Sequence, residues 1–207
     1  MTGVTCEVVQ NARSRRGRPR SFDADAVLIK ARDTFWRAGF QATSLDRLSE
    51  ATGLKRPSLY GAFGDKQALY VALLRAYRES NVASVQRVLG EAATLREGLA
   101  AVYAGAINLY APNGQGCFIL NTAPSEAETD DAVRQELGQV TDDLDGAFAD
   151  RFERAKAEGE VGGRVEPRER GRLATAVLHS LSIRARGGEP RPALEDLART
   201  GVDLLVS

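Results

Sequence analysis

The sequence has few of the residues that build metal centres and disulfide frameworks. It contains one histidine, His179, and two cysteines, Cys6 and Cys117. This pair matches neither zinc-ligand spacing nor a small disulfide-stapled fold, so we expect no metal site and no bound cofactor. The sequence also lacks a GxSxG motif, a P-loop and any paired catalytic constellation, which argues against an enzyme.

Long apolar runs are missing as well. Residues 98–125 carry no charge, but the segment Pro112–Gly116 interrupts them, and neither half is long enough to span a bilayer. The first twenty residues contain no apolar run and end in a cluster of arginines, unlike a signal peptide. We therefore expect a soluble, cytoplasmic protein that does not enter a membrane.

The net charge of zero conceals an uneven distribution along the chain. Residues 1–66 hold 12 Lys and Arg against 7 Asp and Glu, a net of +5, whereas residues 67–207 hold 16 against 21, a net of −5. A basic N-terminal part joined to an acidic remainder indicates that the N-terminal part meets a polyanion.

Apolar residues recur at helical spacing along the chain, and no segment shows the alternation of a strand, so we predict an all-α fold. A first helix runs from Ser21 to Gly39, a second is N-capped by Thr43, and a third spans 55–63 after a turn at Gly53. Further helices are expected at about 66–89, 95–110, 117–126, 129–158, 168–186 and 192–206. We divide the chain into a basic arm (1–20), an N-terminal helical domain (21–81) and a larger helical domain (82–207).

The second and third helices, joined by a glycine-containing turn, form a candidate helix-turn-helix, a motif that places its second helix in the major groove. The residues that open this helix suit a DNA-facing surface: Lys55, Arg56, Pro57, Ser58 and Tyr60. Helix N-terminal amides and cations attract phosphates, and nearby side chains can reach base edges. Spacing alone also allows an ordinary αα-corner with a solvated basic end.

The stretch from Phe22 to Tyr77 resembles the DNA-binding domain of the tetracycline-repressor (TetR/AcrR) family. The resemblance lies in the run DTFWRAGFQATSLDRLSEATGLKRPSLYGAFGDKQALY, including Gly39-Phe40, Thr43-Ser44, Leu59-Tyr60 and Lys66. It implies a sequence-specific transcriptional regulator, in type a ligand-responsive repressor, that binds a palindromic double-stranded DNA operator as a homodimer. It also implies three helices for DNA and a helical ligand-binding and dimerisation domain behind them.

Carried over by position, the resemblance assigns roles to individual residues. Thr43 and Ser44 would contact phosphate at the start of the second helix, and Lys66 would hold a backbone phosphate. The groove surface would be formed by Lys55, Arg56, Pro57, Ser58 and Tyr60. One departure is Lys55, which replaces the small hydroxyl residue that usually caps the recognition helix.

Ahead of this domain, the arm carries the run RGRPR with Arg16, Arg18 and Arg20. The run resembles an AT-hook, in which arginines lie in a narrow A·T minor groove. A solvated basic tail is the alternative, and either arrangement adds sequence-independent affinity for DNA.

The uncharged segment 98–125 is the candidate effector site, because ligand pockets combine apolar walls with a few polar groups. Its candidate residues are Tyr103, Ile107, Tyr110, Cys117, Phe118 and Asn121. Ordinary core is the alternative, and we favour it. Cys117 stands at an expected helix start, where the dipole can lower a thiol pKa; a small buried apolar residue is the alternative.

The last two expected helices, within about 168–206, carry apolar stripes typical of a dimer interface. The stripes comprise Leu173, Val177, Leu181, Leu194, Leu197 and Leu204. Two other classes of protein remain open on the residues alone. One is an architectural DNA-binding protein without a ligand, and the other is a helical enzyme.

Overall fold

The computed structural model describes residues 24–112 and 114–207. Within these ranges the regular structure is helical and no strand occurs, so the all-α prediction is confirmed. The chain divides into two compact units between Ala76 and Tyr77, inside one long helix. The domain limits at residues 20 and 81 stay a prediction. No helix in the described part of the chain has the length and apolar character that crossing a membrane requires.

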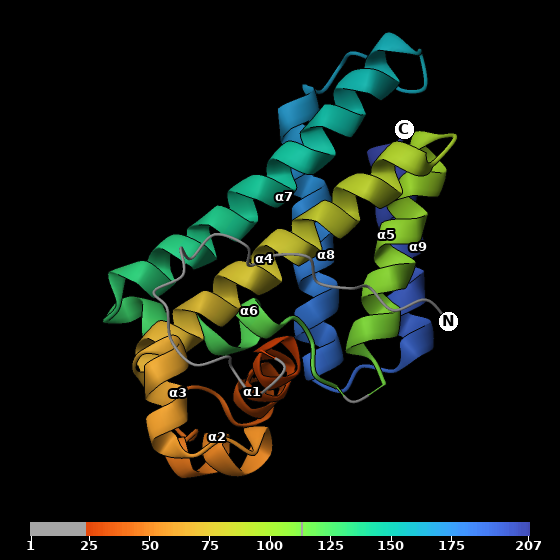
Figure 1. Ribbon diagram of the computed structural model, residues 1–207. Helices are drawn as coiled ribbons and strands as arrows, with labels where there is room; N and C mark the ends of the chain where they lie inside the picture. Colours follow the sequence, from red (N-terminus) through yellow and green to blue (C-terminus); the bar gives the residue numbers. More distant parts are fainter. Residues whose placement is uncertain (1–23, 113) are drawn as a thin grey trace. The chain divides into compact units, whose positions relative to one another are not determined.

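The first unit is built from four helical segments: α1 (Ala24–Ala38), α2 (Leu45–Thr52), α3 (Arg56–Phe63) and the start of α4 (Lys66–Glu91) (Figure 1). Each contributes a buried side chain, namely Phe35, Leu48, Leu59 and Tyr70. The ring of Phe40 lies against this core, with its centroid 4.8 Å from that of Tyr70. The apolar periodicity of the sequence thus closes a small core around the helix-turn-helix.

Two glycines end helices of the first unit where the sequence predicted them. Gly39 and Gly53 have φ of 77° and 75°, in the left-handed region that glycine enters without steric cost. Their amides donate to the carbonyls of Phe35 (2.7 Å) and Ser49 (2.9 Å), which satisfies carbonyls at the helix ends. These predictions are confirmed because each turn depends on a local backbone requirement.

The second unit contains the remainder of α4 and the helices that follow it. These are α5 (Leu95–Tyr110), α6 (Phe118–Thr122), the 3₁₀ turn η1 (Glu126–Glu128), α7 (Asp131–Ala157), α8 (Pro167–Arg186) and α9 (Arg191–Leu205). α8 packs against α5, α7 and α9 and therefore lies at the centre of the unit (Figure 1). The expected helix over 117–126 is wrong in extent, since α6 ends at Thr122 and η1 follows separately.

The contact between α7 and α8 is close enough to require a glycine. A Cβ atom added to Gly171 would lie 2.7 Å from the carbonyl oxygen of Asp145 and 2.9 Å from the amide of Ala149. One residue earlier, the buried Arg170 donates from Nη2 to the carbonyl of Ser207 (3.1 Å) and from Nη1 to that of Leu205. A charged donor therefore satisfies carbonyls at the end of α9.

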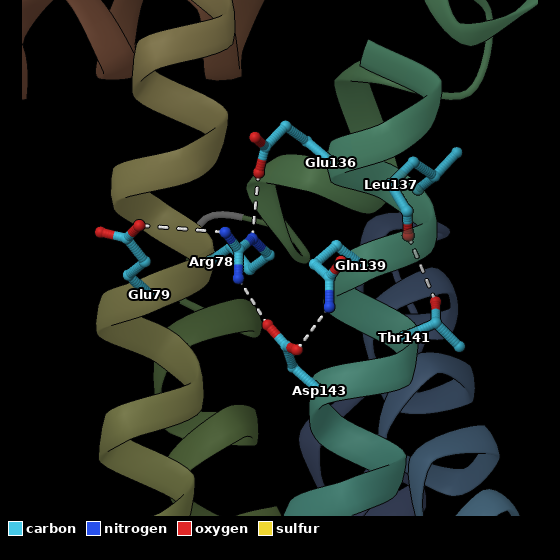
Figure 2. A network of polar contacts seen from close by, with 7 residues as sticks. All are labelled: Arg78, Glu79, Glu136, Leu137, Gln139, Thr141 and Asp143. Atoms are coloured by element: carbon cyan, nitrogen blue, oxygen red, sulfur yellow. Dashed lines mark hydrogen bonds and ion pairs between the residues drawn. The ribbon is translucent and has the colours of Figure 1, made fainter. Parts of the chain in front are cut away.

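A network of charged side chains joins α4 to α7 (Figure 2). Arg78 Nε donates to Glu136 Oε2 at 3.0 Å, and Nη1 donates to Asp143 Oδ2 at 2.5 Å. Gln139 in turn donates to the other oxygen of Asp143 at 2.8 Å. The Glu136 side chain is only 4% exposed, so this carboxylate depends on its counter-charge within the protein.

The apolar stripes expected at the dimer interface range from buried to exposed, with Val177 and Leu197 half-buried. Leu181 and Leu194 are fully buried inside the subunit, so their placement on an intersubunit surface is wrong. Leu173 and Leu204 are exposed by 57% and 72%, and Ile183 on α8 is also exposed. α8 and α9 approach closely at Gly201, whose added Cβ would lie 3.0 Å from Val177 Cγ1. Helix periodicity identified apolar faces, but it did not distinguish the inner face from the outer one.

Candidate nucleic-acid interface

Five side chains predicted to face DNA share the exposed surface of α3. Lys55 precedes the helix as its N-cap, and Arg56, Pro57, Ser58 and Tyr60 follow in its first turn and a half. All five are exposed, whereas Leu59 between them is buried in the core of the first unit. The Lys55 side chain makes no capping hydrogen bond, as its replacement of a hydroxyl residue implied. The helix thus presents its basic N-terminal end and one phenol to solvent.

The start of α2 differs by one residue from the prediction. Ser44, not Thr43, is the N-cap, and its Oγ accepts from the amide of Arg47 at 3.2 Å. The Thr43 hydroxyl is buried and donates to the Gly39 carbonyl at 2.6 Å. Hydroxyl residues stand at both positions, so only the backbone path decided which of them caps the helix. Ser44 is exposed, while the Thr43 side chain has no open path to a phosphate.

Lys66 has a structural function that the sequence did not reveal. Its Nζ donates to the carbonyls of Phe40 (3.1 Å) and Thr43 (3.0 Å) and lies 4.0 Å from the centre of the Phe40 ring. An ammonium group has three donors, so one N–H remains beyond these two bonds. Lys66 therefore holds the turn between α1 and α2, directly ahead of the helix that Ser44 caps.

Arg56 is paired with an acidic side chain that sequence reasoning missed. Its Nε donates to Asp46 Oδ1 at 2.8 Å, and Nη2 donates to the same oxygen. The hydrogen bond and charge of Asp46 raise the pKa of the Arg56 guanidinium. Asp46 and Arg56 lie ten residues apart on different helices, and no local pattern connects them. Arg16, Arg18 and Arg20 of the arm lie outside the described residues.

In the second unit, several candidate effector residues are core. Tyr103, Ile107 and Phe118 are buried, and the Tyr103 hydroxyl donates to the Ala174 carbonyl on α8 at 3.0 Å. Burial raises the pKa of the Tyr103 phenol, so burial favours the neutral, hydrogen-bonded form. These residues pack in the centre of the second unit, as the alternative prediction of an ordinary core for segment 98–125 stated.

Cys117 lies in a buried, neutral environment. Its amide donates to Ser182 Oγ on α8 at 2.7 Å, and the side chain is buried. Burial raises the pKa of the thiol, against opposing hydrogen bonds that include those with the phenols of Tyr77 and Tyr110. The expectation that the helix start lowers this pKa is wrong, because α6 has only five residues and desolvation dominates. Nearby, the Asn121 amide donates to the Gln115 carbonyl.

Three cavities in the second unit are lined by different members of the candidate effector set, with Asn121 in the lining of one of about 410 Å³. One of about 170 Å³ lies between α4 and α5, and Tyr110 is in its lining. A groove of about 320 Å³ lies between α5 and α9, and Ile107 is in its lining. The set is therefore not gathered around one cavity. No cluster of three or more His, Cys, Asp or Glu side chains suited to a metal ion occurs among the described residues.

Known proteins with a similar sequence are bacterial transcriptional regulators. Residues 27–73 match the family model described as bacterial regulatory proteins, tetR family. The transcriptional repressor ComR of Escherichia coli (strain K12) is 29% identical over 208 residues, covering 97% of each chain. The regulator YezE of Bacillus subtilis (strain 168) is 30% identical over 149 residues, covering 71% of this chain and 77% of YezE.

Solved structures give the same result. A cysteine mutant of the TetR-family regulator CifR, in complex with 26-bp operator DNA, superposes with a TM-score of 0.80 at 30% identity, covering 90% of this chain and 98% of CifR. A TetR-family regulator from Agrobacterium tumefaciens has the same fold, with a TM-score of 0.79 at 20% identity, covering 89% and 97%. Every protein named in these comparisons is a transcriptional regulator. The chain belongs to the tetR family of bacterial regulatory proteins and is a helix-turn-helix transcriptional regulator, not an enzyme.

Proposed function

We propose that this regulator is a cytoplasmic repressor that binds a palindromic operator as a homodimer and leaves it when a small-molecule effector binds. The single observation that carries the DNA-binding part is the exposed face of α3. Lys55, Arg56, Ser58 and Tyr60 project from a helix whose opposite side is anchored by the buried Leu59. A helix held by its inner face presents a fixed set of side chains, which is what base reading requires.

Repression is proposed because ComR, named as a transcriptional repressor, aligns with this chain over 97% of both lengths. The operator complex of CifR supports double-stranded DNA as the partner. Ser44 and the remaining donor of Lys66 are proposed phosphate contacts at the edge of the α3 surface. The Thr43 side chain is left out of this surface because it is buried.

The dimer is proposed to form through the outer faces of α8 and α9. Leu173, Ile183 and Leu204 expose large apolar side chains on these two helices. Large apolar side chains exposed on helices of one subunit are compatible with an interface between subunits. A two-fold dimer presents two equivalent α3 helices, so the matching operator is an imperfect palindrome.

The effector is proposed to bind in the second unit, next to Tyr110. The cavity between α4 and α5 is lined by apolar side chains together with Asn81 and Ser84, a composition that suits a small organic molecule. Ligand-dependent release from DNA separates this proposal from an architectural DNA-binding protein, which would keep its DNA at every ligand concentration.

The test begins with a duplex that the wild-type protein enriches from a random-sequence pool. Tyr60→Ala is expected to weaken binding to that duplex by about 5- to 150-fold per subunit, the range for loss of a good direct contact. Ile29→Ala is the matched control, because Ile29 on α1 is exposed by the same 48% as Tyr60 and lies outside the α3 face. Equal affinities for wild type and Tyr60→Ala would show that α3 does not read the DNA.

A further inference from the structure

An acidic residue stands on the surface that is proposed to meet DNA. Asp46, in the first turn of α2, is 73% exposed at its side chain, and its partner Arg56 is 54% exposed. A carboxylate on a DNA-facing surface opposes binding, because it repels the phosphate backbone. The position of Asp46 therefore needs a reason other than affinity.

The hydrogen bonds of the pair show which donors of Arg56 remain open. A guanidinium has five N–H donors arranged in a rigid planar fork. Asp46 Oδ1 accepts from Nε and from Nη2, which are the donors along one side of the fork. The two Nη1 hydrogens and the second Nη2 hydrogen remain, and they include the pair at the tip of the fork. That pair has the geometry that reads guanine O6 and N7 together.

The pair with Asp46 also fixes the orientation of the Arg56 guanidinium. A long arginine side chain at an exposed helix start has many rotamers, and most of them point the guanidinium toward solvent or toward a phosphate. Two hydrogen bonds to one oxygen hold the guanidinium plane of Arg56 at the first helical residue of α3. The fork is thus fixed before DNA arrives, and less side-chain entropy is lost on binding.

We propose that Asp46 is a specificity-determining positioning residue, which aims the tip of the Arg56 guanidinium at a guanine in each operator half-site and weakens binding to other DNA. The inference rests on the proposed function of α3 as the DNA-reading helix. On operator DNA, the oriented fork gains its base contact. On other DNA, Arg56 is already paired and the Asp46 charge repels phosphate.

The test compares the specificity ratio of single variants, meaning the affinity for the selected duplex divided by the affinity for a scrambled duplex of the same length. Asp46→Ala is expected to tighten binding to scrambled DNA, to weaken binding to the selected duplex, and to lower the ratio about 5- to 150-fold per half-site. Arg56→Ala should lower the ratio by a similar factor. The double variant should lose no more than either single variant, because the two residues act as one unit.

Glu50→Gln is the matched control, since it removes a carboxylate from an exposed position one turn further along α2. Glu50→Gln is expected to tighten binding to both duplexes equally and to leave the specificity ratio unchanged. Sequence selection with Asp46→Ala and with Arg56→Ala should relax the base preference at the same position of each half-site.

Several results would overturn the proposal. If Asp46→Ala tightens binding to both duplexes by the same factor, Asp46 acts only as a repelling charge. If it weakens both equally and lowers the melting temperature, its function is to stabilise the first turn of α2. A failure of the proposed function looks different, because Tyr60→Ala and Arg56→Ala would then both leave affinity for the selected duplex unchanged.

Discussion

Replacing Arg78 should reveal how strongly the charged network between α4 and α7 stabilises the second unit (Figure 2). Arg78→Met keeps much of the side-chain length but removes the guanidinium that pairs with Glu136, whose side chain is 4% exposed. Removing one partner of a buried ion pair costs about 3–5 kcal/mol. Arg78 itself is 16% exposed and Asp143 is 26% exposed, so water screens part of this loss. We therefore expect a loss of about 3 kcal/mol in the free energy of unfolding.

Urea denaturation followed by circular dichroism measures this loss. With a slope on the order of 2–3 kcal/mol per molar urea, the midpoint should fall by about 1 M. The concentration of protein must be the same in every sample, because association would stabilise the folded state. Adding Glu136→Gln to Arg78→Met neutralises the buried carboxylate that has lost Arg78 and should restore part of the stability, which a double-mutant cycle quantifies.

Arg87→Met is the control on the same helix. Arg87 pairs with Glu91 at 3.1 Å, but the two side chains are 57% and 67% exposed, and such pairs contribute about 0.5 kcal/mol or less. If Arg78→Met costs no more than Arg87→Met, the buried network is not a source of stability, and the argument from burial is refuted.

Three further predictions concern assembly, pH and the arm. Leu204→Asp places a charge on a side chain that is 72% exposed and should convert a dimer into a 22.3 kDa monomer by light scattering, whereas an unchanged dimer contradicts the proposed interface. Burial lowers the pKa of His179 below 6.5 despite the opposing charge of Asp145, so the unfolded state binds more protons in that range. The free energy of unfolding should therefore be highest above pH 6.5 and should decrease as the pH falls below this value. His179→Gln should make the melting temperature depend less on pH between about pH 7.5 and pH 5.5. An identical pH dependence in both proteins contradicts this prediction. Deleting residues 1–20 should weaken all DNA binding and also abolish a preference for A·T-rich flanks, and equal affinity of the full-length protein for A·T and G·C flanks would leave only a basic tail.

Much of the fold could be predicted from the sequence because its signals are local. Helices form where apolar residues recur every three or four positions, and they end where glycine allows a left-handed turn, as at Gly39 and Gly53. The surface of α3 was predicted from the residue types that open the helix, and the structure exposes these residues while Leu59 is buried. Gly39 and Leu59 also belong to the run of residues that resembles the tetR family.

Only the tertiary structure decided which partners distant residues meet. The Lys66 ammonium lies beside the carbonyls of Phe40 and Thr43 because α1, α2 and α4 close around one core, and the pairing of Asp46 with Arg56 depends on how α2 and α3 pack. Leu181 and Leu173 belong to one apolar stripe of α8, yet one is buried and the other exposed. Cys117 stands at a helix start in the sequence, but burial, which no single segment determines, raises the pKa of its thiol. Local spacing specifies the face of a helix, whereas the contacts and burial of that face depend on the other helices around it.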